Sequence, residues 1–123
     1  MTLKEVAEQL SARVLAGGDE DLAAAATSVA AGDMMSDVLA RADIPDVLVT
    51  GLTTVQAIRT ASVAGIKTVV IVRGKPVPQP MIDLAREESI VLMVTAMKLF
   101  EACGRLWDCG LRPRAGKGKA PEA

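Results

Sequence analysis

The sequence contains no histidine. Histidine is the commonest general base and metal ligand, and His-dependent catalytic triads require it, so the absence excludes those kinds of site. The glycine spacing of a Walker loop is also missing, and so is the glycine fingerprint of dinucleotide-binding folds. No cofactor is therefore expected.

Aromatic residues are almost as scarce, because Phe100 and Trp107 are the only two. A packed core must be built from Val, Leu, Ile, Met and Ala, and there is little aromatic surface on which nucleic-acid bases could stack. Residues 1–111 carry ten basic and fourteen acidic side chains, a net charge of −4. A body of this sign does not attract phosphate backbones, so no binding to nucleic acid is expected.

Long hydrophobic runs are absent too. No apolar stretch approaches the roughly 20 residues that span a bilayer, and the polar, amphipathic N-terminus lacks the apolar core of a signal peptide. We expect a cytoplasmic protein without a membrane partner. In a reducing compartment, two cysteines do not suggest a disulfide framework. Cys103 is expected in the core between Leu99 and Leu106, and Cys109 lies at a helix end beside Gly110. A metal or disulfide shared across a dimer stays open.

The first third of the chain has mixed signals. Thr2 and Glu5 have the spacing of a capping box, which predicts a helix that ends near Ser11. A short strand is expected over 13–15, followed by a turn over 17–19. The Ala-rich segment 22–31 is interpreted as a strand, and a helix is expected over 34–42 with Asp33 as its N-cap.

Three short apolar runs follow at 46–50, 68–72 and 90–94, with starts about 22 residues apart. Each precedes a helical pattern. The second helix begins near Pro80, and the third carries an apolar face that we assign to Leu99, Phe100, Cys103, Leu106 and Trp107. Continuously apolar strands are typical of sheets covered on both faces, and right-handed crossovers make them parallel neighbours.

These units predict an α/β fold: a mainly parallel sheet of βα units covered by helices, with an N-terminal α-plus-strand subdomain. The domain is expected to cover 1–111. Gly, Pro, Lys and Ala dominate from Arg112 onward, so 112–123 is interpreted as a disordered basic tail.

The carboxyl edge of a parallel sheet is where ligands usually bind. Gly51-Leu52-Thr53-Thr54 joins the first strand to its helix, whose N-terminus exposes free N–H groups. Arg73-Gly74-Lys75 ends the second strand on the same edge, as a cationic clamp over an anion. The predicted ligand-binding residues are Gly51, Thr53, Thr54, Arg73, Gly74 and Lys75. The alternative is an ordinary turn, an ordinary threonine cap and a solvated basic loop.

The middle of the chain contains four closely spaced acidic residues, Asp33, Asp37, Asp43 and Asp46. Paired carboxylates can do acid–base work or hold Mg²⁺, but cap and turn roles fit these positions better. An enzyme built on Asp33, Asp37 and Lys75 would need all three in one pocket.

Three stretches together resemble the stand-alone DRTGG-domain proteins: Asp33–Leu39, Asp46–Thr50 and Ile66–Val72. The closing segment Leu99–Leu106 fits the same family. Typical members have Gly-Asp-Arg where this chain has Gly51-Leu52-Thr53, and Thr-Gly-Gly where it has Val72-Arg73-Gly74. The resemblance implies the fold of the N-terminal domain of HPr kinase/phosphorylase and an accessory role in dimerisation or regulation. Similar small proteins tend to be encoded beside iron-only hydrogenase components.

The expected function is a non-enzymatic regulatory or ligand-sensing module that binds a small anion or a nucleotide phosphate. One alternative is a redox or metal-cluster accessory protein using Cys103 and Cys109, and another is a small phosphate-handling enzyme. The hydrophobic content of 50% is high, and it favours a homodimer through Met34, Met35 and the Met81–Ile82 pair. A different protein partner stays open.

Overall fold

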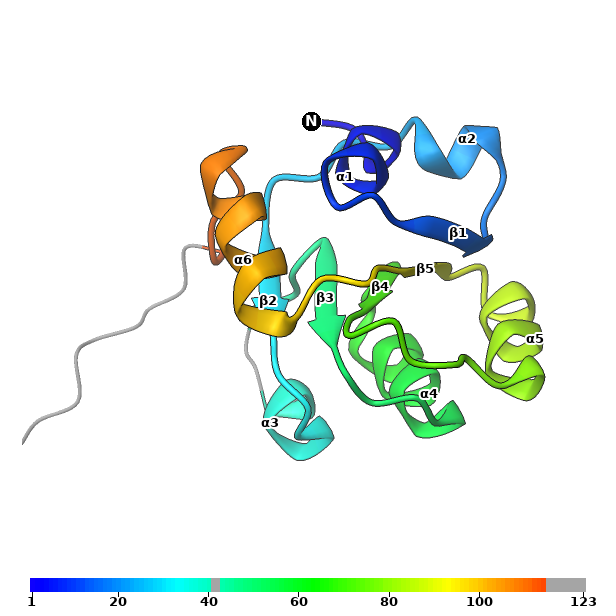
Figure 1. Ribbon diagram of the computed structural model, residues 1–123. Coiled ribbons are helices and arrows are strands. Elements are labelled where there is room, and N and C mark those ends of the chain that lie inside the picture. Colours follow the sequence, from blue (N-terminus) through cyan, green and yellow to red (C-terminus); the bar gives the residue numbers. More distant parts are fainter. Residues whose placement is uncertain (41–42, 115–123) are drawn as a thin grey trace, which may run out of the picture.

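The chain forms a sheet whose strand order is β1-β5-β4-β3-β2 (Figure 1). The computed structural model describes residues 1–40 and 43–114. Four neighbouring strands are parallel, and β1 pairs antiparallel with β5. The strands are β1 (Arg13–Ala16), β2 (Val29–Ala31), β3 (Val47–Thr50), β4 (Thr68–Ile71) and β5 (Val91–Val94). The predicted α/β class and the three adjacent parallel strands are confirmed.

Helices cover both faces of this sheet. Right-handed crossovers between successive neighbours place α3, α4 and α5 on one face, and α1 and α6 cover the other. The bounds are α1 (Leu3–Gln9), α2 (Asp19–Leu22), α3 (Met35–Leu39), α4 (Val55–Ala64), α5 (Gln79–Glu87) and α6 (Leu99–Asp108). The predicted N-terminal subdomain does not stand apart, because β1 completes the same sheet and α1 packs on it.

Local signals set several helix ends, two of them as expected. Thr2 Oγ1 accepts a hydrogen bond from the Glu5 N–H at 3.2 Å, and Glu5 accepts one from the Thr2 N–H at 2.9 Å, so the capping box is confirmed. Pro80 lies in the first turn of α5, and Gly65 ends α4 with φ of +83°. A side chain is disfavoured at that φ, which explains glycine there.

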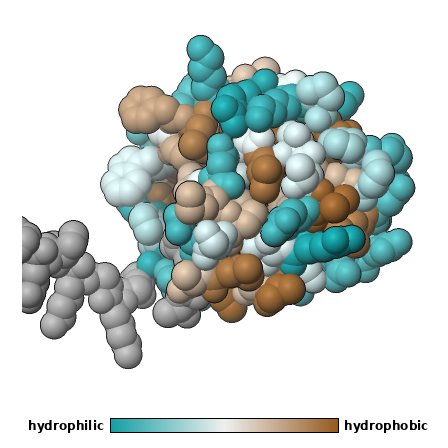
Figure 2. Space-filling view, turned by 90° about the horizontal axis from the view of Figure 1, so that it is seen from below, coloured by the Kyte–Doolittle hydropathy of each residue, from teal (hydrophilic) through white to brown (hydrophobic). Residues whose placement is uncertain are grey.

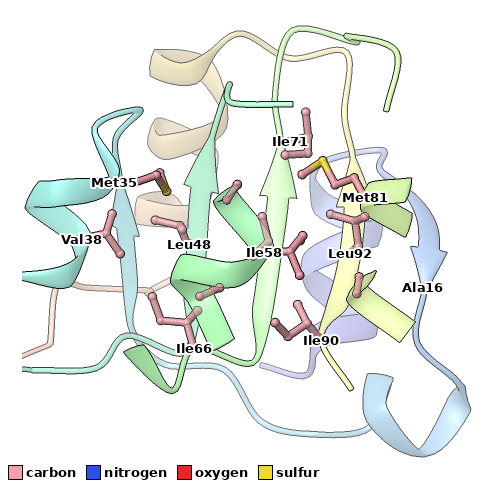
Figure 3. Packing of buried hydrophobic residues seen from close by; sticks show 14 of the residues in the cluster. Ala16, Met35, Val38, Leu48, Ile58, Ile66, Ile71, Met81, Ile90 and Leu92 are labelled. Atoms are coloured by element: carbon pink, nitrogen blue, oxygen red, sulfur yellow. The ribbon is translucent and has the colours of Figure 1, made fainter. Parts of the chain in front are cut away.

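Two apolar layers enclose the sheet. Figure 3 shows the layer beneath α3, α4 and α5, in which Leu48, Ile71 and Leu92 of the strands meet Ile58 and Met81 of the helices. Aliphatic and Met side chains fill the place of the missing aromatics.

The proposal of Met35 and Met81 as dimer contacts is wrong. Met81 is fully buried and Met35 nearly so, because both fill the monomer's own core. Ile82 is partly buried against the same core, and Met34 is 62% exposed.

Three other expectations are corrected. The segment 22–31 is not one strand, because Leu22 ends α2 and the strand begins at Val29. The helix expected over 34–42 is α3, which spans only Met35–Leu39. Met34 is its N-cap in place of Asp33, and residues 41–42 lie outside the described residues. Phe100 and Trp107 are 92% and 53% exposed, because the sheet covers only the narrower stripe of α6 that contains Ala102 and Leu106.

The first residues of the predicted tail contact the domain. Arg112 exchanges backbone hydrogen bonds with Thr27 and Val29 beside β2, and its guanidinium lies 3.7 Å from the centre of the Trp107 ring. Arg114 forms an ion pair with Asp46 at 3.6 Å. Residues 115–123 lie outside the described residues, so the prediction of disorder there stays a prediction.

No helix within residues 1–40 and 43–114 has the length and apolar content needed to cross a bilayer.

Candidate functional site

The parallel strands β2 to β5 all end at one edge of the sheet, and the loops that leave them meet there. Figure 2 looks onto this end of the molecule, where hydrophilic and hydrophobic residues are interspersed. Most of the predicted ligand-binding residues lie here, on the loops after β3 and β4. Asp33, which follows β2, joins them.

Asp33 and Arg73 meet at Gly51. The Asp33 carboxylate accepts hydrogen bonds from the Gly51 N–H at 2.7 Å and from the Thr50 hydroxyl at 3.2 Å. The Arg73 guanidinium forms an ion pair with the same carboxylate at 3.4 Å. A Cβ atom on Gly51 would overlap this guanidinium, so glycine leaves the space in which Arg73 lies.

Lys75 also contacts Gly51. Its ammonium donates a hydrogen bond to the Gly51 carbonyl at 2.9 Å. An ammonium has three donors, so two are left for another acceptor. Gly51, Arg73 and Lys75 are thus brought together as the sequence predicted.

The turn that carries Arg73 is held by backbone hydrogen bonds. Arg73 and Gly74 both adopt positive φ, +68° and +59°. The Arg73 N–H donates to Met97 and the Gly74 N–H to Thr95, both in the segment after β5. These bonds fix the loop, and the left-handed backbone at Arg73 is strained for a residue with a side chain.

The electrostatics of the cluster favour an ionised Asp33. The hydrogen bond from the Gly51 N–H lowers the pKa of Asp33 most, partial burial opposes that effect, and Thr50, Arg73 and Lys75 lower the pKa further. Because Asp33 compensates the charge of Arg73, this guanidinium is not a free anion clamp. Asp33 also does not cap α3, which was the role that the sequence assigned to it.

Thr53 and Thr54 do not join the cluster. Thr54 is the N-cap of α4, yet its side chain makes no capping hydrogen bond. The Thr53 hydroxyl has no hydrogen-bond partner among the described residues. Thr54 therefore takes the N-cap position that the alternative interpretation gave to a threonine, but without the side-chain hydrogen bond of a cap, and neither hydroxyl lines the cavity described next.

A cavity of about 260 Å³ opens beside Lys75, between β1, the end of β5 and the loop that leads to α5. Among the described residues that line it are two cations, Arg13 and Lys75, and no Asp or Glu. Within the described chain, the Arg13 guanidinium has no hydrogen bond or ion pair. The apolar wall is formed by Leu15, Pro76, Val77, Ile82 and Val94.

Sequence reasoning missed Arg13. Its place depends on β1 running antiparallel to β5, which puts the amino end of β1 at the carboxyl edge of the other strands. No local pattern signals this arrangement. Asp33 was missed as a member of the cluster because it was assigned to the cap of the next helix, although the strand was correctly expected to end at Ala31, which places Asp33 at the same edge.

The enzyme alternative required Asp33, Asp37 and Lys75 in one pocket. Asp33 and Lys75 hold the N–H and the C=O of Gly51, while Asp37 is exposed on α3 and has no side-chain hydrogen bond in the part of the chain described. Asp37 thus shares no hydrogen bond or ion pair with Asp33 or Lys75 within the described residues.

The two cysteines are free thiols of α6 and its C-cap, and both are half-buried. Burial raises the pKa of Cys103, which disfavours the reactive thiolate. Residues 1–40 and 43–114 contain no group of three or more His, Cys, Asp or Glu side chains placed to hold a metal.

Comparison with known proteins gives the family match of the chain and a solved structure of similar fold. Residues 5–108 match the DRTGG domain family, and no curated protein matches the chain. A similar solved structure contains the CBS and DRTGG domains of the regulatory region of Clostridium perfringens pyrophosphatase, complexed with the activator diadenosine tetraphosphate. The TM-score is 0.72 and the identity is 16%, over 85% of this chain and 45% of that one. This chain therefore spans less than half of that structure, and the likeness shows a shared fold.

The sequence resemblance and the match over nearly the whole described length agree: the chain belongs to the DRTGG domain family.

Proposed function

We propose that the protein is a non-enzymatic regulatory module that binds a small anionic ligand at the carboxyl edge of its sheet. The observation that carries this proposal is the cavity that Arg13 and Lys75 line together with an apolar wall, and whose described lining contains no carboxylate. Its volume of about 260 Å³ is just below the roughly 300–1,000 Å³ of typical ligand clefts, so the ligand is small or only partly enclosed.

The two cations would bind the anionic group. Arg13 offers its guanidinium donors without having to break a hydrogen bond or ion pair to another described residue, and Lys75 keeps two donors after binding the Gly51 carbonyl. The apolar wall suits a planar or aliphatic portion of the same ligand. A nucleotide phosphate with its base against the wall, or an organic carboxylate, has this combination.

The family supports a regulatory role. The similar pyrophosphatase structure comes from a regulatory region and was solved with a nucleotide activator. By analogy, we propose that this chain signals occupancy of its cavity to another protein or domain and does not transform the ligand. The arrangement of Asp33, Asp37 and Lys75 supports the non-enzymatic part of the proposal.

Thermal-shift measurements at low salt test the proposal with ATP, ADP, diadenosine tetraphosphate, inorganic phosphate and citrate. A ligand at 100 times its dissociation constant stabilises the folded state by about 2.7 kcal/mol, which raises the melting temperature by several degrees. Arg13→Gln should raise the dissociation constant of whichever compound stabilises the protein at least tenfold. The matched control is Arg59→Gln, because Arg59 is exposed on α4 and does not line the cavity.

Two results would refute the proposal. One is the absence of stabilisation by any of the five compounds at millimolar concentration. The other is an equal response of the Arg13→Gln and Arg59→Gln variants. A ³¹P NMR spectrum of the bound nucleotide should show it intact after hours, since hydrolysis would contradict the non-enzymatic assignment.

A further inference from the structure

The loops at the carboxyl edge differ in charge from the rest of the domain. The segments that link β2, β3, β4 and β5 to the helices after them carry three cations, Arg73, Lys75 and Lys98, and one carboxylate, Asp33. The net charge over residues 1–111, in contrast, is −4. A concentration of positive charge on one edge attracts anions to that edge, and most strongly those with several negative charges.

Arg73 is held in place by a single weak contact. One guanidinium nitrogen lies 3.4 Å from the Asp33 carboxylate, and the two side chains are 44% and 51% exposed. A strong pair of this kind is bidentate with distances of about 2.7–2.9 Å, and exposed pairs contribute little. The other guanidinium donors of Arg73 have no hydrogen bond among the described residues. Arg73 can therefore turn to another acceptor.

Asp33 keeps its main contacts when Arg73 leaves. Its Oδ1 atom accepts the hydrogen bonds from the Gly51 N–H at 2.7 Å and from the Thr50 hydroxyl at 3.2 Å. The contact with Arg73 is made by the other oxygen, Oδ2. The departure of the guanidinium therefore breaks neither Oδ1 hydrogen bond, and the loop after β3 stays tied to Asp33.

Arg73 and Lys75 reach the same residue, Gly51. The Lys75 ammonium donates to the Gly51 carbonyl at 2.9 Å, and the Arg73 guanidinium fills the space that a Cβ atom on Gly51 would need. Lys75 also lines the cavity that Arg13 lines. One ligand can therefore place an anionic group against Arg13 and Lys75 and reach Arg73 with a second anionic group.

We propose that the ligand carries two linked anionic groups and that Arg73 leaves Asp33 to bind the second of them. This inference rests on the proposed function, in which the first group binds to Arg13 and Lys75. A ligand with a single anionic group fills the cavity and leaves the Asp33–Arg73 ion pair intact. Asp33 thus determines specificity, because only a second anionic group replaces the carboxylate that Arg73 gives up.

Isothermal titration calorimetry at low salt tests this with three pairs of compounds, in which the second member has additional anionic groups. The pairs are phosphate and pyrophosphate, AMP and ADP, and acetate and citrate. In at least one pair the second member should bind at least about tenfold more tightly, which is the effect of one charge-assisted hydrogen bond. The pair with the largest ratio distinguishes a phosphate ligand from a carboxylate ligand.

Three variants assign the effect to Arg73. Arg73→Gln should bring the affinity of the second member down to that of the first and leave the first unchanged. Asp33→Asn should lower the dissociation constant of the second member about twofold to fivefold, because no ion pair has to be broken. Lys98→Gln is the matched control, because this exposed loop cation does not line the cavity; it should keep the wild-type ratio.

The results separate this inference from the proposed function. Absence of binding by all six compounds overturns both. Binding that depends on Arg13 but shows no preference for the second member in any pair overturns only this inference, and so does a preference that Arg73→Gln leaves unchanged. Weaker binding of the second member by Asp33→Asn also overturns it, because Asp33 would then support the site instead of competing for Arg73. Far-UV circular dichroism checks that each variant is folded.

Discussion

Replacing Asp33 tests whether the cluster around Gly51 holds the carboxyl edge together. Asp33→Ala leaves the Gly51 N–H without a partner in a buried residue, which costs about 1–3 kcal/mol. It also removes the ion pair with Arg73, worth about 0.2–1 kcal/mol because both side chains are half-exposed. We expect a loss of about 2 kcal/mol in the free energy of unfolding, or a melting temperature lower by roughly 6–10 °C.

Asp33→Asn separates geometry from charge, because the amide oxygen can still accept the Gly51 N–H. It should cost about 1 kcal/mol at pH 7, as charge-assisted hydrogen bonds exceed neutral ones. The folded-state pKa of Asp33 is lowered, so its contribution is present above the unfolded pKa of about 3.9 and is lost as pH falls through the folded pKa. The difference between wild type and Asp33→Asn should therefore persist at pH 7 and 5 and shrink at pH 3.

Urea unfolding followed by circular dichroism measures these differences. The control is Asp37→Ala, four residues along the chain, whose exposed side chain makes no hydrogen bond within the described residues; it should change stability by less than about 0.5 kcal/mol. Equal stability of Asp33→Ala and Asp37→Ala would refute the reasoning. So would a charge contribution that grows as the pH falls.

Three further predictions concern the body of the domain. Thr95→Val should cost about 1–3 kcal/mol in urea unfolding, because the buried hydroxyl donates to the Leu10 carbonyl at 2.6 Å and this acceptor would lose its partner; an unchanged midpoint would contradict it. Met81→Ala should lower the free energy of unfolding by about 2–5 kcal/mol in the same assay, since the Met81 side chain of α5 is fully buried. A loss under about 1 kcal/mol would mean that the core is loosely packed. In a Cys109→Ser background, Cys103 should react with a thiol reagent at pH 8 more slowly than glutathione, because burial raises its pKa; faster reaction would support the redox alternative.

Local sequence patterns were sufficient to predict the βα units. The continuous apolar runs that became β3, β4 and β5 are bounded by turns and followed by helical periodicity, so their type and parallel order follow from short-range rules. The weaker elements were misjudged where local signals conflict. The Ala-rich segment has no decisive periodicity, and α6 carries apolar residues on more of its surface than the monomer covers.

The candidate site was predictable only in part. The turn after β4 and the glycine after β3 lie at the carboxyl edge of the sheet because parallel strands end at the same edge. The sequence is sufficient to predict this placement. The partner of Arg73 is Asp33, 40 residues away, and the second cation of the cavity is Arg13 on an antiparallel strand. Such placements depend on the strand order of the whole sheet, which no local pattern encodes.

Titration of the ¹⁵N-labelled protein with whichever of the five compounds raises its melting temperature most, followed by amide NMR spectra, tests the central claim most directly. Binding at the carboxyl edge predicts saturable shifts that cluster at Gly74, Lys75, Val77 and Ala96, with smaller changes along α6. Shifts that are absent at a millimolar concentration of every one of the five compounds, or that centre on α6 and β2 and leave the Gly74–Val77 loop unmoved, would contradict it.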